Sequence, residues 1–272
     1  MPNKILSFRF IFSSSVIFFL LLVIVFANKL ILFDPEEVNL SLRLTPPNLA
    51  HPFGCDILGR DLFKLVILGA RQTLYLVTIA VSISTVIGTT FGILAGFFRG
   101  YVDTIIMRSV DILMTFPGIL LAMTLASILG PSVNNIIIAI SATGWTATAR
   151  LVRGQVLSLR EREHITAART LGCSSGHILV RHILPFLWTP LIVSTTFSLS
   201  GVILIEASLS FLGLGANSAI PTWGSLLFQG RTVLSEAPFL CMIPGVMIAL
   251  LVWFFNFLGE SLRDHLDPRF LH

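Results

Sequence analysis

Side chains that can form ion pairs or exchange protons gather in one segment of the 272-residue chain, between Arg150 and Pro185. It is the only strongly charged segment, and apolar runs free of acidic and basic residues flank it on both sides. Histidines 177 and 182 also lie in it, where packing is a better interpretation than metal ligation. Its ionic side chains suit peripheral charge pairs, each of which contributes little alone: Arg160, Glu161, Arg162, Glu163 and Arg169.

A second polar group lies in the apolar run that follows Arg181. Ser194, Ser198 and Gly201 fall on one helix face, with Glu206 slightly further round and near the end of the run. Carboxylates inside a membrane are energetically unfavourable and usually face a cavity or the interior of a helix bundle. Two interpretations stay open. The face lines a hydrophilic translocation pathway, or its hydroxyls bond back to their own helix while Glu206 sits at the wet interface.

Motifs for catalysis and nucleotide binding are missing. The chain has no GxxxxGK[ST] loop, no GxSxG and no HExxH. The six histidines lie outside the predicted spans, and Cys55, Cys173 and Cys241 lack the spacing of a disulfide framework or a metal site. We therefore expect no catalytic residue, no metal and no cofactor bound by this chain. If the chain transports a solute, the energy must come from a partner or from an ion gradient.

Composition indicates a multi-pass membrane protein. Hydrophobic residues make up 54% of the chain and charged residues 12%, whereas a soluble domain carries about twice that charged fraction. The net charge of +4 is modest, and its basic residues sit beside apolar spans, so nucleic-acid binding is not indicated.

Charge-free stretches locate the predicted spans, at about 20 residues for each crossing. The Asp111–Arg150 stretch is long enough for two helices, because Gly130-Pro131-Ser132 breaks it near the middle. The prediction is an all-α protein with six transmembrane helices and both termini on one side. The stretches are Arg9–Lys29, Arg71–Arg99, Asp111–Arg150, Arg181–Glu206 and Glu236–Glu260.

The placement of Lys and Arg predicts the orientation. With both termini in the cytoplasm, twelve of these residues lie inside and six outside, as the positive-inside rule favours. The 150–185 loop is then cytoplasmic. Three regions follow: a retained anchor helix in residues 1–33, an extracytoplasmic linker with an interfacial helix in 34–71, and a core of five spans in 72–272. The interfacial helix is expected between Asp56 and Gln72, with an irregular loop as the alternative.

Three local patterns predict how the spans are shaped and packed. Gly88, Gly92 and Gly96 recur every four residues, which lets another helix approach closely in lipid. Pro117 is expected to kink the third span or end its first regular stretch. Arg108 and Asp111, about one turn apart, could pair near the inner interface.

The charged loop resembles the EAA loop, by which permeases of ABC importers dock onto their ATPases. The resemblance is carried by Ala167-Ala168, by Gly172, and by Leu184-Pro185 at the end of the loop. Thr166 replaces the leading Glu of the family, and His182 replaces the Ile that precedes Leu-Pro.

Further stretches are similar to the dipeptide/oligopeptide/nickel permease family, in the subunit type with a short outer N-terminal region. Together they cover most of residues 50–270. They read HPFGCDILGRD (51–61), GYVDTIIMRSVDILMTFP (100–117), GWTATARLVRGQVLSLRE (144–161), EASLSFLGLG (206–215), PTWG (221–224) and FNFLGESLRDHLDPR, which ends at Arg269.

This resemblance implies the type I ABC importer permease fold and a place in the bacterial cytoplasmic membrane. It implies a second homologous permease subunit, two ATPase subunits that bind ATP and Mg, and an extracytoplasmic substrate-binding protein. The Thr166–Gly172 region would form a coupling helix in a groove of one ATPase, a helix-in-groove contact. The coupling-loop residues it points to are Glu163, Thr166, Ala167, Ala168, Gly172, His182, Leu184 and Pro185.

Three functions remain in view at this stage. An ABC permease that imports peptides is favoured, with nickel or another small solute as the alternative cargo. A gradient-driven secondary transporter would need ion-coupling charges inside its spans, which are nearly free of charge. A membrane-embedded enzyme would need a cluster of His, Cys or carboxylate residues that the sequence does not show.

Overall fold

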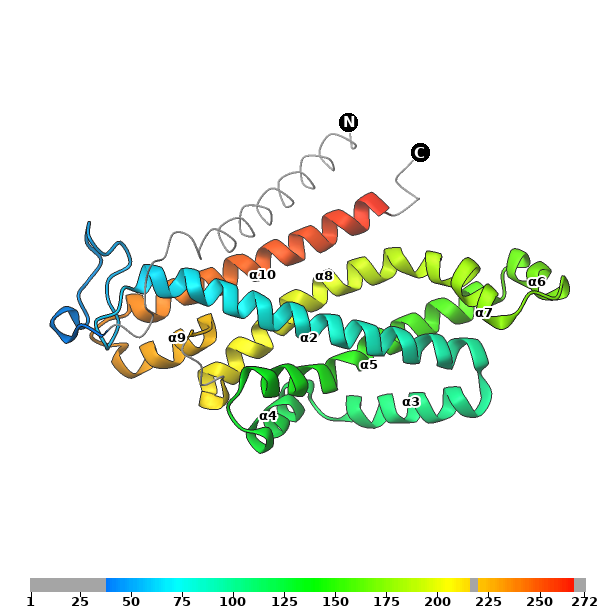
Figure 1. The fold of residues 1–272 in the computed structure, drawn as a ribbon, viewed down its shortest axis with the longest axis horizontal. Helices are drawn as coiled ribbons and strands as arrows, with labels where there is room; N and C mark the ends of the chain where they lie inside the picture. Colours follow the sequence, from blue (N-terminus) through cyan, green and yellow to red (C-terminus); the bar gives the residue numbers. More distant parts are fainter. Residues whose placement is uncertain (1–37, 216–219, 267–272) are drawn as a thin grey trace.

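A computed structural model describes residues 38–215 and 220–266. The anchor helix predicted in residues 1–33 lies outside these ranges. Long helices run nearly parallel, with α6 and α7 at one end and α9 with the 38–61 loop at the other (Figure 1). The helices are α2 (Leu62–Phe98), α3 (Gly100–Thr115), α4 (Gly118–Leu129), α5 (Val133–Arg160), α6 (Glu163–Thr170), α7 (Ser175–Ile178), α8 (Leu184–Leu209), α9 (Trp223–Gly230) and α10 (Phe239–Leu266).

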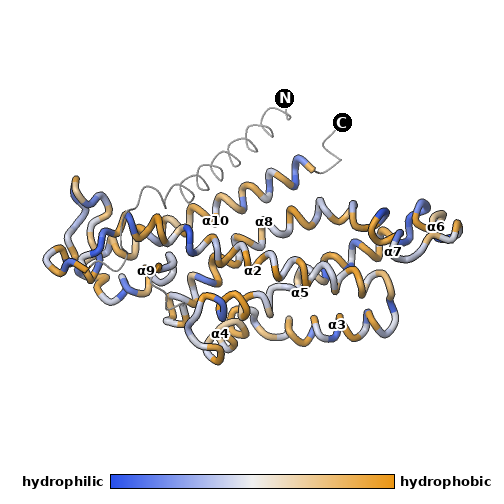
Figure 2. The backbone as a smooth tube through the Cα atoms, in the orientation of Figure 1, coloured by the Kyte–Doolittle hydropathy of each residue, from blue (hydrophilic) through white to orange (hydrophobic). Residues whose placement is uncertain are grey.

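Three helical stretches in the described residues are long and apolar enough to cross a membrane: Leu62–Phe98, Ser175–Leu214 and Phe239–Leu266. A fourth is reached if α3 and α4, which are bent by 88° at their junction, are counted as one broken span. Hydrophobic residues dominate the middle of α10, and hydrophilic residues gather toward α6 and α7 (Figure 2). The chain is therefore an all-helical, multi-pass membrane protein.

The first described helix is longer than the sequence predicts. No separate interfacial helix forms between Asp56 and Gln72, because residues 62–72 are the first turns of the 37-residue helix α2. Asp61 caps that helix, since its side chain accepts hydrogen bonds from the backbone N–H groups of Phe63 and Lys64. Leu62, Leu65 and Val66 are buried in the core, which explains their helical spacing without an interfacial position.

Breaks in the helices fall at the residues that cannot continue them. Arg99 and Gly100 both have positive φ, so the chain turns sharply between α2 and α3. Pro117 ends the regular stretch of α3 and precedes α4, as predicted. Gly130, with φ of 86°, caps α4 before α5 begins at Val133.

The glycine repeat of α2 packs against α5, as the sequence predicts. A Cβ atom at Gly92 would lie 2.7 Å from the Ala149 carbonyl oxygen and 2.7 Å from the Val152 Cβ. Gly88 and Gly96 meet α5 equally closely, one turn to either side. The two helices therefore touch backbone to backbone over three turns, and only glycine fits at these positions.

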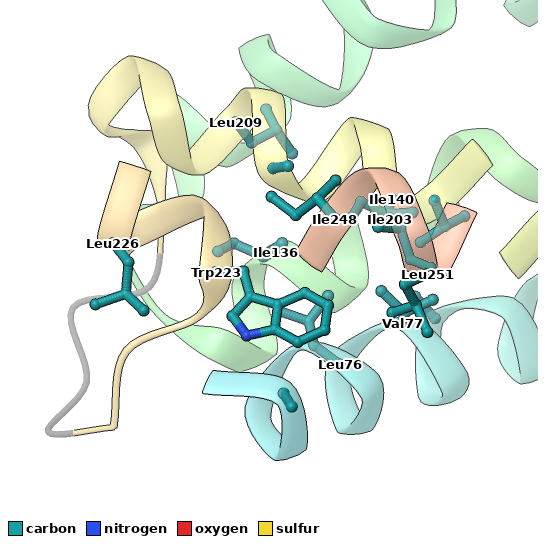
Figure 3. Packing of buried hydrophobic residues seen from close by; sticks show 14 of the residues in the cluster. Leu76, Val77, Ile136, Ile140, Ile203, Leu209, Trp223, Leu226, Ile248 and Leu251 are labelled. Carbon is teal, nitrogen blue, oxygen red and sulfur yellow. The ribbon is translucent and has the colours of Figure 1, made fainter. Parts of the chain in front are cut away.

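Buried hydrophobic residues form two clusters. The α9-side cluster joins α2, α5, α8, α9 and α10 around the Trp223 side chain, beside Leu76 and Ile248 (Figure 3). The Trp223 indole N–H donates to the Val66 carbonyl oxygen at 2.8 Å, so the segment before α10 is fastened to α2. The α6-side cluster contains Phe97, Val152, Val156, Leu159, Ile165, Ala168, Ile178, Ile183, Leu187 and Leu191.

Candidate functional site

A short helix, α6 (Glu163–Thr170), lies where the sequence predicts the coupling helix. It begins earlier than the predicted Thr166 and ends before Gly172. Glu163 lies in its first turn and Arg169 in its last, where each charge complements the helix dipole. Gly172 follows the helix with φ of 80°, and the Gly172 N–H donates to the Arg169 carbonyl oxygen. This left-handed residue makes the turn that the sequence predicts.

The two alanines of the loop differ in exposure. Ala168 is buried with Ile165 in the α6-side cluster, so it packs against this chain and not against a partner. Thr166 and Ala167 are exposed. The prediction that both alanines admit a partner is therefore corrected: only Ala167 offers a small side chain on the outer face of α6. Helix rotation decides this, because adjacent residues on a helix point about 100° apart.

The α6-side cluster connects α6 to the long helices. Ile165 and Ala168 share it with Phe97 of α2, Val156 of α5 and Leu187 of α8. Buried side chains at interior density leave little room for independent movement. The cluster therefore packs α6 directly against three long helices.

The remaining predicted loop residues shape the return from α6 to the membrane. His182 lies in a π-helical turn, Leu179–Ile183, with its ring 6.3 Å from that of His164 between centroids. Leu184 begins α8, and Pro185 occupies its first turn, where a missing N–H is tolerated. Within the described part of the chain, no three His, Cys, Asp or Glu side chains are grouped to hold a metal.

Two of the predicted peripheral charges bond inside this chain. Arg160 donates to the Phe97 carbonyl oxygen, which ties the end of α5 to the end of α2. Glu161 pairs with Arg99, also at the end of α2. The Arg162 guanidinium lies 5.6 Å from the ring centroid of Phe186. These three contacts join the end of α5 and the residues after it to α2 and α8.

The polar face predicted on α8 is formed only in part. Ser194 and Ser198 are half-buried, and the Ser198 hydroxyl donates to the Ser194 carbonyl oxygen at 2.9 Å, in the same helix. Gly201 is exposed, and no atom would lie within 4 Å of a Cβ there. The hydroxyls thus bond back to their own helix at least once, and the pathway role stays a prediction.

Glu206 does not join that face. Its side chain is fully buried, so Glu206 neither sits at the wet interface nor lies open to a pathway in this chain. The Ser210 hydroxyl donates to Glu206 Oε1 at 2.8 Å, and Glu206 Oε2 has no hydrogen-bond partner. Gly224 of α9 packs closely against Ala207 and Ser210, so α9 covers this part of α8.

The structure also brings together charged residues that sequence reasoning missed. Asp103 of α3 bonds Arg153 of α5 through both carboxylate oxygens. Asp111 bonds Arg150 at 2.8 Å, and not Arg108 as the sequence suggested. The spacing of these residues could have indicated the pairing. Asp103 and Asp111 are two turns apart on α3, and Arg150 and Arg153 are three residues apart on α5. The sequence alone does not reveal that α3 folds back onto α5.

The chain is similar in sequence to known transport proteins. The sequence profile of one family, described as the binding-protein-dependent transport system inner membrane component, matches residues 88–272. The dipeptide transport system permease protein DppC of Alkalihalophilus pseudofirmus is 42% identical over 249 residues, covering 92% of this chain and 82% of that protein. The glutathione transport system permease protein GsiD of Pectobacterium atrosepticum is 41% identical, covering 93% of this chain and 85% of that protein.

Solved structures share the fold. The MetNI methionine ABC transporter, in inward-facing conformations, matches with a TM-score of 0.64 at 18% identity, covering 76% of this chain and 98% of the matched chain. An amino acid ABC transporter with histidines matches with a TM-score of 0.60 at 15% identity, covering 75% of this chain and 95% of the matched chain. The all-helical arrangement is thus one that ABC transporter chains adopt.

Proposed function

The chain belongs to the family of inner membrane components of binding-protein-dependent transport systems, and we propose that it is the permease subunit of an ATP-driven importer of short peptides. The peptide cargo is supported by relatives named for dipeptide and glutathione transport, each about 40% identical over most of this chain. The single structural observation that supports coupling to an ATPase is α6, a short helix with an exposed face and a buried face.

The proposed topology has six spans with both termini in the cytoplasm. Residues 1–33 supply the first span, α2 the second, α3 with α4 the third, α5 the fourth, α8 the fifth and α10 the sixth. Lys and Arg placement in the sequence supports the orientation, since twelve fall in the segments assigned to the cytoplasm and six in those assigned to the outside. The α6 end is then cytoplasmic, and α9 with the 38–61 loop is extracytoplasmic.

The proposed assembly has this chain beside a second homologous permease subunit, above two ATPase subunits. Those ATPases bind ATP and Mg, and this chain binds no cofactor and performs no hydrolysis. An extracytoplasmic binding protein delivers the peptide to the α9 side. The exposed face of α6 lies in a groove of one ATPase, where Ala167 permits close approach.

Coupling follows from how α6 is seated. Closure of the ATPases on ATP moves α6, and the α6-side cluster passes this movement to α2, α5 and α8. ATP then shifts the balance between inward-open and outward-open conformations, since it binds the closed ATPase pair more tightly than the open one. The permease transmits that shift.

Co-purification and uptake test the proposal. The assembled complex is purified in detergent through this chain, and binding-protein-dependent uptake of dialanine is measured in proteoliposomes with ATP. We expect Ala167→Trp to lose the ATPase subunits and at least ten-fold in uptake while the second permease stays bound. Ala50→Trp, also an exposed alanine but in the 38–61 loop, is the matched control and retains the ATPases.

Two results would contradict the proposal. A chain that purifies without ATPases and moves solute on an ion gradient is a secondary transporter. ATP-driven uptake of nickel and not of dialanine would keep the coupling mechanism and remove the peptide cargo.

A further inference from the structure

We propose that Asp111 and Arg150 form a charged subsite in the translocation pathway, which engages the ammonium and carboxylate termini of a zwitterionic peptide. The inference rests on the peptide-import function proposed above. Arg150 Nη2 lies 2.8 Å from Asp111 Oδ1, and the two side chains are 51% and 59% exposed. The pair is formed, yet both groups remain open to the surroundings of the chain.

A neighbouring pair on the same two helices is built differently. Arg153 meets Asp103 through two hydrogen bonds, one of them 2.7 Å between Arg153 Nη2 and Asp103 Oδ2. Those side chains are 32% and 18% exposed. The bidentate, half-buried pair fastens α3 to α5, so that attachment does not require the single exposed contact of Asp111 with Arg150.

The position of the exposed pair along the helices places it within the apolar length of α2. Gly92 of α2 faces Ala149 and Val152 of α5, so Arg150 lies near the level of Gly92. Arg99, the next charged residue of α2, is seven residues further toward the cytoplasmic end, or roughly 10 Å along the helix. An ion pair at that depth is disfavoured against lipid and is expected beside water or protein.

The surroundings of Arg150 favour water. Exposed residues on its face of α5 are small or polar: Ala147, Gly154 and Ser158. The exposed residues on one face of α10 are large and apolar instead: Met242, Val246, Leu250 and Trp253. Helix α5 is also absent from the helices apolar enough to span on their own. The α10 stripe suits lipid, and the α5 stripe suits an aqueous pathway.

The chemistry of the pair fits a zwitterion. A carboxylate accepts hydrogen bonds from an ammonium group, and a guanidinium binds a carboxylate with up to two parallel bonds. An exposed ion pair contributes little to stability, so a peptide can separate the two side chains readily. The site thereby binds each terminus weakly and releases it, as transport requires.

Uptake kinetics test this subsite in the assembled complex. Asp111→Asn and Arg150→Gln are each expected to lower dialanine uptake five- to twenty-fold at saturating binding protein, while ATP hydrolysis stays stimulated. Arg99→Gln is the matched control, because Arg99 also forms an exposed ion pair, at the ends of α2 and α5. We expect its uptake to stay within two-fold of the unsubstituted complex.

Exchanging the two charges distinguishes peptide binding from a purely structural role in attaching α3 to α5. The double variant Asp111→Arg with Arg150→Asp rebuilds the ion pair but presents reversed charges to the peptide that the binding protein delivers. We expect uptake to stay low and α3 to remain folded. Recovery of uptake to the unsubstituted rate would overturn the subsite and leave a structural ion pair.

Cysteine labelling tests whether the face meets water. The three native cysteines are replaced by Ala, and Ala147→Cys on α5 is compared with Val246→Cys on α10. A water-soluble methanethiosulfonate is expected to modify Ala147→Cys and to block uptake, and to leave Val246→Cys unmodified. Failure to modify Ala147→Cys, or loss of the second permease from Asp111→Asn, would overturn the proposal.

Different results would overturn the proposed function and the proposed subsite. If the unsubstituted complex imports another solute and not dialanine, the peptide cargo falls, and the subsite for peptide termini falls with it. If dialanine uptake is normal in the unsubstituted complex and in Asp111→Asn and Arg150→Gln alike, the subsite alone is wrong.

Discussion

Helix α5 holds its two neighbours in opposite ways. Against α2 it packs backbone to backbone, with Gly88, Gly92 and Gly96 leaving no space for a Cβ atom. Against α3 it relies on ion pairs, and Val110 is the one buried residue among those of α3. Close packing is short-ranged and stiff, whereas ion pairs at half-exposed positions tolerate displacement.

This difference assigns mechanical roles within the bundle. We expect helices α2 and α5 to move as one body together with α6, because the α6-side cluster joins all three. Helix α3 is a separate arm between the turn at Arg99-Gly100 and the 88° bend before α4. Conformational change during transport is therefore expected at α3 before it is expected between α2 and α5.

The largest effect is expected at the glycine contact. Gly92→Ala introduces a Cβ within 2.9 Å of the Ala149 carbonyl oxygen and of two Val152 carbon atoms, so the helices must separate. We expect a loss of about 3 kcal/mol, as for overpacked cores, measured as a lower thermal midpoint in detergent. Gly154→Ala on α5 is the control, since its Cβ would meet no atom within 4 Å.

A smaller effect is expected where α3 is fastened. Asp103→Asn leaves the Arg153 guanidinium without its charged partner, at a position that is only partly exposed. The loss should be about 2 kcal/mol, between that of exposed and fully buried pairs. Hydrogen exchange should rise in α3 and not in α2. Equal protection of both helices would show that the ion pair does not hold α3.

The turn between α2 and α3 should respond more weakly. Gly100 has φ of 59° and open space around its Cβ position, so Gly100→Ala meets only the backbone penalty of that conformation. About 1 kcal/mol is expected, again from the thermal midpoint in detergent. A shift as large as that of Gly92→Ala would mean that the turn is packed, contrary to its surroundings.

The smallest effect is expected from Arg99→Gln. Its ion pair with Glu161 is 46% and 65% exposed, so solvent screens it and the change should stay within about 0.5 kcal/mol. A larger loss would indicate that Arg99 is covered in the assembled transporter.

Much of the fold could be predicted because it depends on local patterns. Charge-free runs located α2, α8 and α10, Gly130 and Pro117 marked breaks, and the spacing of Gly88, Gly92 and Gly96 indicated a close helix contact that the structure confirms. The number of spans and the orientation stay predictions. Helix α5 shows why prediction stops there. Two of its charged residues pair with residues of α3, and the sequence alone does not show that the two helices are neighbours.

The candidate site could be predicted in place but not in orientation. The sequence by itself determined that a charged loop with Ala167, Ala168 and Gly172 interrupts the apolar spans, since composition and spacing are properties of the chain. Only the tertiary structure decided that Ala168 faces inward, that Glu206 is buried beneath α9, and that Asp111 meets Arg150. These outcomes depend on helix rotation and on which helices become neighbours, and both are set by packing between segments far apart in the sequence.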